Sequence, residues 1–393
     1  SNKFLNPRTS GAVLPIVHIN GFKISNPTIY ASMSNKELTM LFKGMGYEPL
    51  IVEGKNIYRK MIRAVEYAYQ KIRKIQALAR SPKKPEIQPI WPVILMRTTK
   101  GWTGPKMFEG HHIEGSFRSH GIPFDNPQKH PHEFEVIKKW LSSYHIHDLV
   151  DERGRPKPNV LTFVPTGTHR IGMNRHAVGG NFYKKLKLPS LEKHEIKFKK
   201  RAGEKASSMI TTGKVFRDII RLNPKNFRIF CPDELESNLL HNVFEATTRG
   251  YVWPIVKNSE DVAYDGRVYE MLSEHTLEGW MQGYILSGRH GVFVSYEAFA
   301  TIIASMVDQH AKFLKQSFAI PWRTPIPSSI YLLSSVSWRQ DHNGYSHQNP
   351  SFVSNVLQKH PEFCQIYYPP DANSLLAAIE EVSKKHDSIA VIV

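Results

Sequence analysis

Short, continuously apolar runs alternate along this chain with segments whose apolar residues recur at helical spacing. Runs of this kind are typical of strands that are buried on both faces of a parallel sheet. The pattern therefore predicts an α/β fold. The predicted strands are residues 12–18, 92–96, 160–164, 228–231, 292–295, 330–334, 364–368 and 389–393.

Helical patterns lie between most of these runs. They include residues 268–286 and 374–385. A further pattern contains the basic stretch 71–84, whose lysines and arginines lie opposite an apolar stripe, as on a solvated helix face. The stripe consists of Met61, Val65, Tyr69, Ile72 and Leu78.

A charged stretch at residues 189–208 separates the predicted elements into two groups, and its Pro, Gly and Ser residues are typical of a linker. We interpret residues 1–188 and 209–393 as two α/β domains. The final residues, IAVIV, resemble a buried strand, and Asn20 already follows the first strand. Both ends therefore predict a piece of a longer enzyme, with the first domain incomplete and the second truncated.

Composition places the chain among folded proteins, with 41% hydrophobic and 22% charged residues. The two cysteines, Cys231 and Cys364, are too few for a disulfide framework, which favours a reducing compartment such as the cytoplasm. No apolar run reaches the length of about 20 residues that spans a bilayer, and no signal-peptide pattern is present. We therefore expect no membrane partner.

The chain is strongly basic, since 52 Lys+Arg against 35 Asp+Glu give a formal net charge of +17. Such a charge attracts phosphate groups, and nucleic acid is one class of partner that it indicates. The basic stretches are not interleaved with aromatic residues and belong to no known nucleic-acid module. Small phosphorylated anions are therefore the expected partners.

Four polar clusters follow directly after predicted strands. They contain Asn20 in VHINGFK, Lys100 in RTTKGW, Tyr296 in VFVSYE, and residues 340–347 in WRQDHNGYSH. Because the carboxyl ends of parallel strands share one edge of a sheet, each cluster is expected at the site edge of its own sheet. One such cluster is ordinary loop chemistry, whereas four in one chain favour a functional site.

The last of these clusters is unusually dense in polar groups, because residues 339–347 include Arg, Gln, Asp, Asn and two His. A polar surface loop is one interpretation, and metal ligation by His342 and His347 is another. Their spacing in a Gly-containing loop lacks the regularity of helical zinc motifs. Proton transfer and phosphate contact suit these histidines better.

Two glutamates, Glu274 and Glu278, interrupt the apolar face of the helical pattern at 268–286. A carboxyl buried there would hold and share a proton near neutrality. A surface glutamate that is paired with a neighbour is the alternative, and spacing alone favours it.

Four long segments carry a resemblance to a known family. They are SWRQDHNGYSHQNP, LSEHTLEGWMQGYILSGRHGVFVSYE, LMRTTKGWTGPK with EGSFRSHGIP, and SNKFLNPRTSGAVLPIVHINGFKISNPT. They resemble phosphoketolases, which are thiamine-diphosphate-dependent enzymes of transketolase-like architecture, and the resemblance covers essentially the whole chain. It implies the later part of a diphosphate-binding domain in 1–188 and most of a pyrimidine-binding domain in 209–393. The family's GDG metal-binding motif, early catalytic histidines and third domain are not in this sequence, so the chain alone is expected to be inactive.

The resemblance implies roles at the cofactor. Asn20 and the carbonyl of Phe22 match ligands of the Mg²⁺ that bridges the diphosphate, and oxygen ligands suit that cation. Glu274 matches the catalytic glutamate that bonds the aminopyrimidine ring, and Tyr296 matches the aromatic residue that stacks on it.

Lys100 and His120 match catalytic groups near the diphosphate and the reacting carbon, where they stabilise negative charge. The loop that meets substrate and intermediate is matched by Gln340, His342, Asn343 and His347, with Asn343 also at the cofactor. His347 is the candidate acid–base group for a dehydration step.

Ser237 of ESNLL matches a contact to the substrate phosphate. The family usually has arginine two residues later, whereas this chain has Leu239. Loss of a bidentate phosphate donor should weaken or alter substrate binding.

The implied reaction is the phosphorolytic carbon–carbon cleavage of xylulose 5-phosphate or fructose 6-phosphate by a homodimer. It yields acetyl phosphate with glyceraldehyde 3-phosphate or erythrose 4-phosphate, and the cofactor serves as the electron sink. Three alternatives remain: a paralogue with altered substrate preference, indicated by Leu239; a non-catalytic thiamine-fold scaffold, indicated by the chain ends; and a nucleic-acid module, indicated by the charge.

Overall fold

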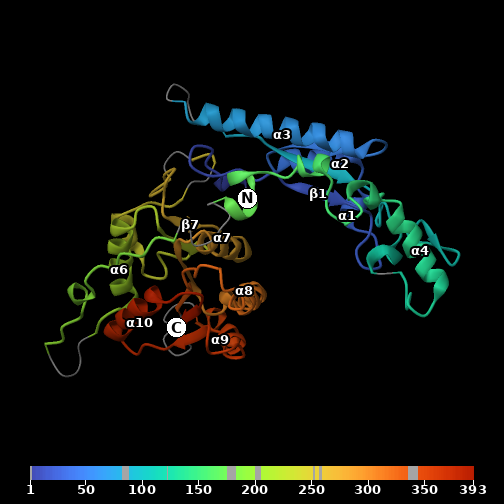
Figure 1. Cartoon of the computed structure of the whole chain (residues 1–393). Helices are drawn as coiled ribbons and strands as arrows, with labels where there is room; N and C mark the ends of the chain where they lie inside the picture. Colours follow the sequence, from blue (N-terminus) through green and yellow to red (C-terminus); the bar gives the residue numbers. More distant parts are fainter. Residues whose placement is uncertain are drawn as a thin grey trace. The chain divides into compact units, whose positions relative to one another are not determined.

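The computed structural model describes residues 2–81, 88–121, 123–174, 183–199, 205–250, 253–255, 259–334 and 344–393. The chain forms two compact units, an N-terminal unit of Asn2–Val164 and a C-terminal unit of Pro165–Val393 (Figure 1). The sequence pattern predicts that the first domain ends at residue 188. Leu188 and Leu191 pack against the core of the C-terminal unit, and the assignment of diphosphate- and pyrimidine-binding domains stays a prediction.

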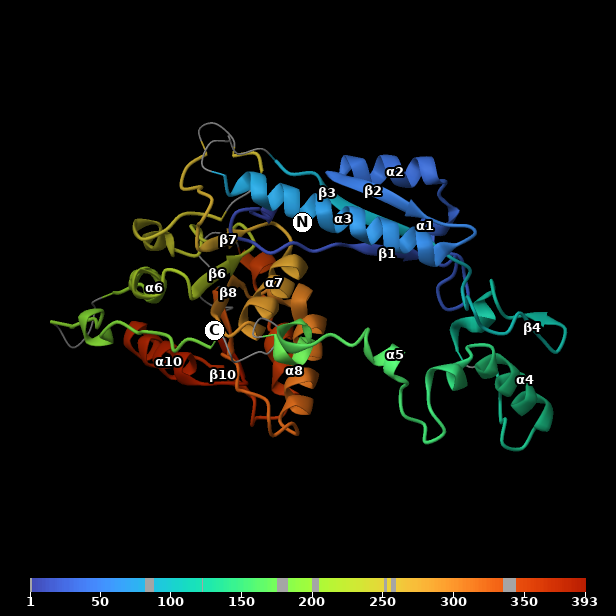
Figure 2. The same ribbon diagram turned by 45° about the horizontal axis from the view of Figure 1, so that its top comes forward.

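The N-terminal unit is built on a parallel sheet with the strand order β1-β3-β2. These strands are β1 (Ile16–Ile19), β2 (Tyr47–Val52) and β3 (Trp91–Arg97), and a small antiparallel pair joins β4 (Met107–Phe108) to β5 (His111–His112). The helices are α1 (Ile29–Ser32), α2 (Asn35–Gly44), α3 (Ile57–Ala79), α4 (Pro131–Ser142) and α5 (Pro158–Leu161). Leu38 and Phe42 of α2 pack on Val93 and Leu95 of β3, and α3 runs beside the same sheet (Figure 2).

The C-terminal unit contains a six-stranded parallel sheet with the order β10-β11-β9-β8-β6-β7. Its strands are β6 (Phe227–Cys231), β7 (Val268–Glu270), β8 (His290–Tyr296), β9 (Ser329–Ser334), β10 (Cys364–Tyr367) and β11 (Ile389–Ile392). Its helices are α6 (Ser208–Leu222), α7 (Glu274–Leu286), α8 (Ala304–Ser317), α9 (Ser351–Leu357) and α10 (Ala372–Lys384).

Both faces of this sheet are covered, which explains the continuously apolar runs. Val292 and Val294 of β8 belong to the cluster that includes α6 and α10, whereas Phe293 belongs to the cluster that includes α7, α8 and α9. Successive side chains of a strand point to opposite faces, so a strand with helices on both sides buries every residue. Figure 1 shows α6 and α10 grouped apart from α7, α8 and α9.

The α/β prediction is confirmed, and most predicted strands lie where the sequence placed them. The prediction of a strand at residues 160–164 was wrong. Pro158 begins the short helix α5, and the Val160 N–H donates to the Lys157 carbonyl. Phe163 in the same run is 87% exposed. An apolar run that no second layer covers is not stabilised by burial when it forms a strand. Proline also favours the first turn of a helix.

Three further elements differ from the prediction. The first strand begins only at Ile16, after Pro15, which has no N–H to donate to a ladder. Residues 268–270, predicted as helix, form β7 beside β6. Strand β2 was missed because it contains Glu48 and Pro49, which an edge strand tolerates.

Candidate functional site

In the N-terminal unit, the chain turns sharply after β1. The Asn20 side-chain Oδ1 accepts a hydrogen bond of 3.2 Å from the Phe22 N–H. Gly21 lies between them with φ of +103°, a conformation that side chains with a Cβ rarely adopt. The turn closes where Thr28 N–H donates to the Gly21 carbonyl at 3.0 Å. Asn20 and Phe22 are thus held together at the end of β1.

Lys100, at the end of the neighbouring strand β3, reaches this turn. Its ammonium group donates to the Lys23 carbonyl and to His120 Nδ1, the latter over 3.2 Å, and the residue is only 7% exposed. His120 comes from the 3₁₀ helix Phe117–His120. Gly101 allows this approach, since a Cβ there would lie 2.5 Å from the Cβ of Ser119. The structure therefore joins the turn after β1, Lys100 and His120 at the carboxyl edge of one sheet.

In the C-terminal unit, Tyr296 ends β8 and meets His347. Their ring centroids are 4.8 Å apart with the planes at 89°, and Phe299 lies against the same imidazole at 5.0 Å. The His347 carbonyl accepts from the Ala298 N–H at 3.3 Å. Two residues singled out by sequence are thus neighbours, although they lie 51 positions apart in the chain.

A residue that the sequence analysis missed, Glu234, lies at this edge. It follows β6, is 8% exposed, and its carboxylate accepts from the Tyr296 N–H at 3.0 Å and the Ser295 hydroxyl at 3.3 Å. Burial raises the pKa of Glu234 to about 7, and the charge of Glu274 acts in the same direction. The signal that could have found it was its place directly after a predicted strand, the rule that selected Tyr296.

The turn after β6 also carries Ser237. Its exposed hydroxyl donates to the Glu234 carbonyl at 3.1 Å, and Asn238 next to it donates to the same carbonyl at 2.7 Å. Asn238 in turn accepts from Ser334 at the end of β9. Leu239 is 44% exposed and has φ of +60°. Hydrogen bonds therefore connect the ends of β6, β8 and β9, which are adjacent in the sheet.

Glu274 is the first residue of α7 and is half-buried. Glu278, one turn further along, is the buried glutamate, with no exposed surface. Tyr331 donates to its Oε1 at 2.7 Å and Gln282 donates to the same oxygen at 2.7 Å. Burial raises the pKa of Glu278 to about 7. The expectation that spacing alone favoured, a surface glutamate, is therefore wrong for Glu278.

Three of the predicted site residues, Gln340, His342 and Asn343, lie outside the described residues, as does the first half of the loop at 337–350. Their predicted roles stay predictions. His347 is the predicted site residue of that loop that the structure describes.

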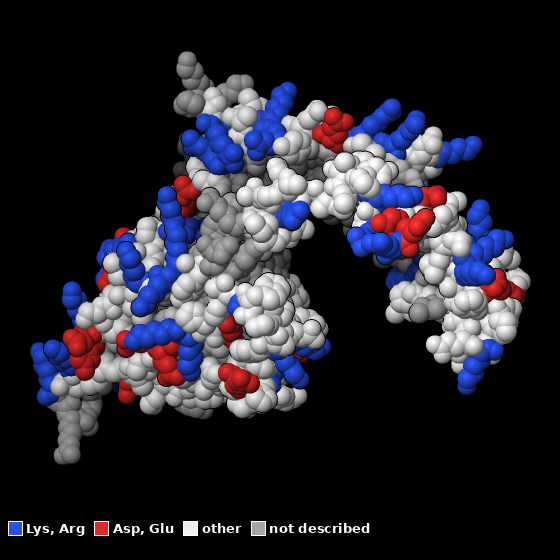
Figure 3. Space-filling view, in the orientation of Figure 1, with Lys and Arg blue, Asp and Glu red and all other residues white. Residues whose placement is uncertain are grey.

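The basic charge is distributed over the surface. On the face drawn in Figure 3, Lys and Arg side chains are interrupted by acidic and uncharged residues. Within the part of the chain that the structure describes, none of the helices combines the length and apolarity needed to cross a bilayer. The predictions about nucleic acid and membranes stay predictions.

Solved transketolases share this architecture. A transketolase variant from Pichia stipitis matches 96% of this chain and 51% of its own, with a TM-score of 0.59 at 14% identity. The transketolase of Campylobacter jejuni matches 96% and 51%, with a TM-score of 0.54 at 15% identity. At such identities the likeness concerns the fold alone. The chain has a transketolase-like α/β fold.

Sequence relatives narrow the class. The family described as D-xylulose 5-phosphate/D-fructose 6-phosphate phosphoketolase matches residues 210–385, and its N-terminal domain matches residues 1–182. A "Probable phosphoketolase" of Rhodopirellula baltica is 46% identical over 398 aligned residues, covering all of this chain and 50% of the relative. "Probable phosphoketolase 2" of Rhizobium meliloti is 45% identical and is covered to 51%. The chain belongs to the phosphoketolase family, and it spans about half the length of the curated relatives it matches.

Proposed function

We propose that this chain serves in a thiamine-diphosphate-dependent phosphoketolase that cleaves xylulose 5-phosphate, fructose 6-phosphate or both. The observation that carries the proposal is the cluster at the carboxyl edge of the C-terminal sheet. There Tyr296 meets His347, and Glu234 joins Tyr296 to the turn that carries Ser237. This cluster lies where α/β sheets bind ligands, in a chain of this family.

The residues fit the pyrimidine end of thiamine diphosphate. The Tyr296 hydroxyl is buried and has no hydrogen-bond partner among the described residues, so a ligand with polar atoms would satisfy it. Glu274, at the start of α7, would bond the aminopyrimidine, and Tyr296 would stack on it. When bound, the cofactor supplies an electron sink for carbon–carbon cleavage.

The N-terminal group fits a diphosphate and its cation. Asn20 and the Phe22 carbonyl offer the oxygen ligands that Mg²⁺ prefers. The Lys100 ammonium, held by the Lys23 carbonyl and His120, is a largely buried positive charge that would bind a phosphate oxygen. A buried cation acts strongly on an anion because little water screens it.

The remaining residues would act on the substrate. Ser237 is exposed on its turn and would donate to the sugar phosphate. His347 would move a proton during the loss of water that precedes capture by inorganic phosphate, because one imidazole nitrogen can accept a proton while the other donates one. The products would be acetyl phosphate with glyceraldehyde 3-phosphate or erythrose 4-phosphate. We further propose a cytoplasmic homodimer, and no activity for the 393-residue chain by itself.

The test is a colorimetric assay for acetyl phosphate with the protein translated from its complete reading frame. The assay supplies thiamine diphosphate, Mg²⁺, inorganic phosphate and either sugar phosphate. We expect product, and we expect Glu274→Ala to abolish both product and cofactor-induced fluorescence quenching. Glu380→Ala on the exposed face of α10 is the matched control and should behave as wild type. Absence of acetyl phosphate with both sugars would refute the proposal.

Leu239 favours a second candidate, a paralogue with altered substrate preference. A guanidinium binds a phosphate through two parallel hydrogen bonds, and leucine cannot. The same assay discriminates the candidates, because a paralogue would bind the cofactor and lose it in Glu274→Ala, yet turn over neither pentulose nor hexulose phosphate. Absence of cofactor binding, or binding that survives Glu274→Ala, would indicate a non-catalytic scaffold.

A further inference from the structure

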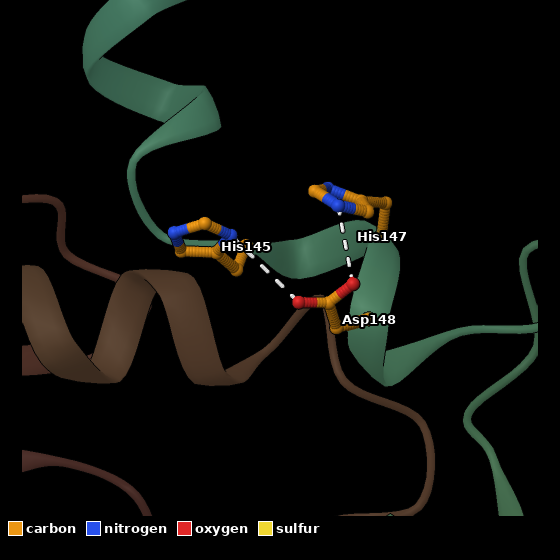
Figure 4. A group of neighbouring side chains, drawn as sticks. All are labelled: His145, His147 and Asp148. Carbon is orange, nitrogen blue, oxygen red and sulfur yellow. Dashed lines mark ion pairs between the residues drawn. The ribbon is translucent and has the colours of Figure 1, made fainter.

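Three exposed side chains beyond the α4 helix form a group that the proposed reaction does not use. They are His145, His147 and Asp148, in the sequence HIHD, and their ligand atoms all lie within 4.8 Å of one another. Figure 4 shows both imidazole rings facing the same carboxylate. His145 Nδ1 lies 3.7 Å from one carboxylate oxygen and His147 Nε2 lies 3.1 Å from the other.

These distances are close to those between the ligands of a zinc ion. Zinc–nitrogen and zinc–oxygen bonds of about 2 Å in a tetrahedron place neighbouring ligand atoms about 3.3 Å apart. The separations of 3.1 and 3.7 Å end on the two different carboxylate oxygens, and one ligand atom from each residue lies within 4.8 Å of the others. Two imidazoles with one carboxylate are also a ligand set that leaves a fourth position for water. Side-chain rotations that bring the three ligand atoms to about 3.3 Å from one another would complete the site.

The backbone already holds these residues together. The Asp148 N–H donates to the His145 carbonyl at 2.9 Å, within the 3₁₀ turn Ile146–Leu149. His145 is kept at φ of +51°, and Lys157 Nζ donates to the Asp148 carbonyl at 3.0 Å. A fixed backbone lowers the entropy that metal binding must overcome.

An ion pair alone accounts poorly for this arrangement. The three side chains are 64–74% exposed, and exposed ion pairs contribute at most about 1 kcal/mol. A dication bound between the three groups would give both imidazoles and the carboxylate one common partner.

We propose that His145, His147 and Asp148 bind a late divalent transition-metal ion such as Zn²⁺. The affinity is expected in the micromolar range, because the ligands are exposed and the neighbouring Lys157 ammonium repels a cation. The bound metal would restrict the motion of the turn that follows α4. Since protons compete with the metal for imidazole nitrogen, binding should weaken as the pH falls.

The test is calorimetric titration of the metal-free 393-residue chain with ZnCl₂ at pH 7.5, together with visible absorption after addition of Co²⁺. We expect one equivalent to bind, with a tetrahedral Co²⁺ spectrum. His145→Asn, His147→Ala and Asp148→Asn should each weaken binding by about tenfold or more. Asparagine at position 145 retains the left-handed backbone, since it is one of the residues that tolerate positive φ.

The matched control is the double variant His111→Ala/His112→Ala, which removes another exposed pair of histidines, on β5. It should leave Zn²⁺ affinity unchanged. Equal loss in this control would show general surface binding and overturn the proposal. The proposal also fails if the chain binds no metal, or if all three ligand variants bind as wild type does. Far-ultraviolet circular dichroism confirms that each variant is folded.

Discussion

The buried glutamate Glu278 makes a quantitative prediction about stability and pH. Its carboxyl is enclosed between α7 and β9 and accepts from Tyr331 and Gln282 through Oε1, while Oε2 has no partner among the described residues. Burial and the nearby Glu278 raise the pKa of Tyr331, so the phenol keeps its proton and remains the donor. A neutral Glu278 fits this pocket, and an ionised one is disfavoured.

The magnitude follows from the pKa. Burial raises the pKa of Glu278 from 4.5 to about 7, and this difference corresponds to about 3 kcal/mol. The folded chain holds this proton between pH 4.5 and 7, whereas the unfolded chain has released it. Stability from this group is therefore present below pH 4.5 and is lost as the pH rises to 7.

The perturbation is Glu278→Gln, which keeps the oxygen acceptor and the shape but cannot ionise. The quantity of interest is the free energy of unfolding of the variant minus that of wild type. We expect this difference to be about 3 kcal/mol larger at pH 8 than at pH 4.5. Urea unfolding followed by circular dichroism across this range measures the difference. The control is Glu380→Gln, an exposed glutamate paired with Lys384, whose difference from wild type should hardly change with pH. A difference for Glu278→Gln that is equal at both pH values would falsify the reasoning.

Three further predictions follow from other residues. Phe293→Ala in β8 removes a side chain with no exposed surface and should cost about 3–5 kcal/mol in urea unfolding. Burial lowers the pKa of His290 to about 4, so the free energy of unfolding should fall by up to about 3 kcal/mol as the pH drops from 6.5 to 4. His290→Gln should lose less stability than wild type over this pH range. Equal acid sensitivity of the variant and wild type would contradict this. In the complete enzyme, Leu239→Arg should lower the KM for sugar phosphates by about tenfold or more, because the guanidinium adds charged hydrogen bonds to the phosphate. An unchanged KM with normal cofactor binding would show that the turn carrying Ser237 does not bind the substrate phosphate.

The sequence also shows the limits of local pattern. Residues 160–164 are as apolar as several true strands, yet Pro158 and the lack of a covering layer make them a surface helix. The place of Lys100 after a predicted strand tied it to a site, whereas His120 could be tied to one only through the family resemblance, because nothing in their spacing indicates that they meet. The turn at Gly101 brings them to 3.2 Å.

By itself, the sequence determined the α/β class, the positions of most strands and the family. Strands covered by helices on both faces must be apolar at every position, and this local requirement is visible along the chain. The tertiary structure decided which polar groups are buried and which of them meet. Glu278 is buried because Tyr331, 53 residues away, encloses it, and Glu234 joins the site because β6 and β8 are neighbours in the sheet. Burial and proximity depend on contacts between distant segments, and no local pattern records them.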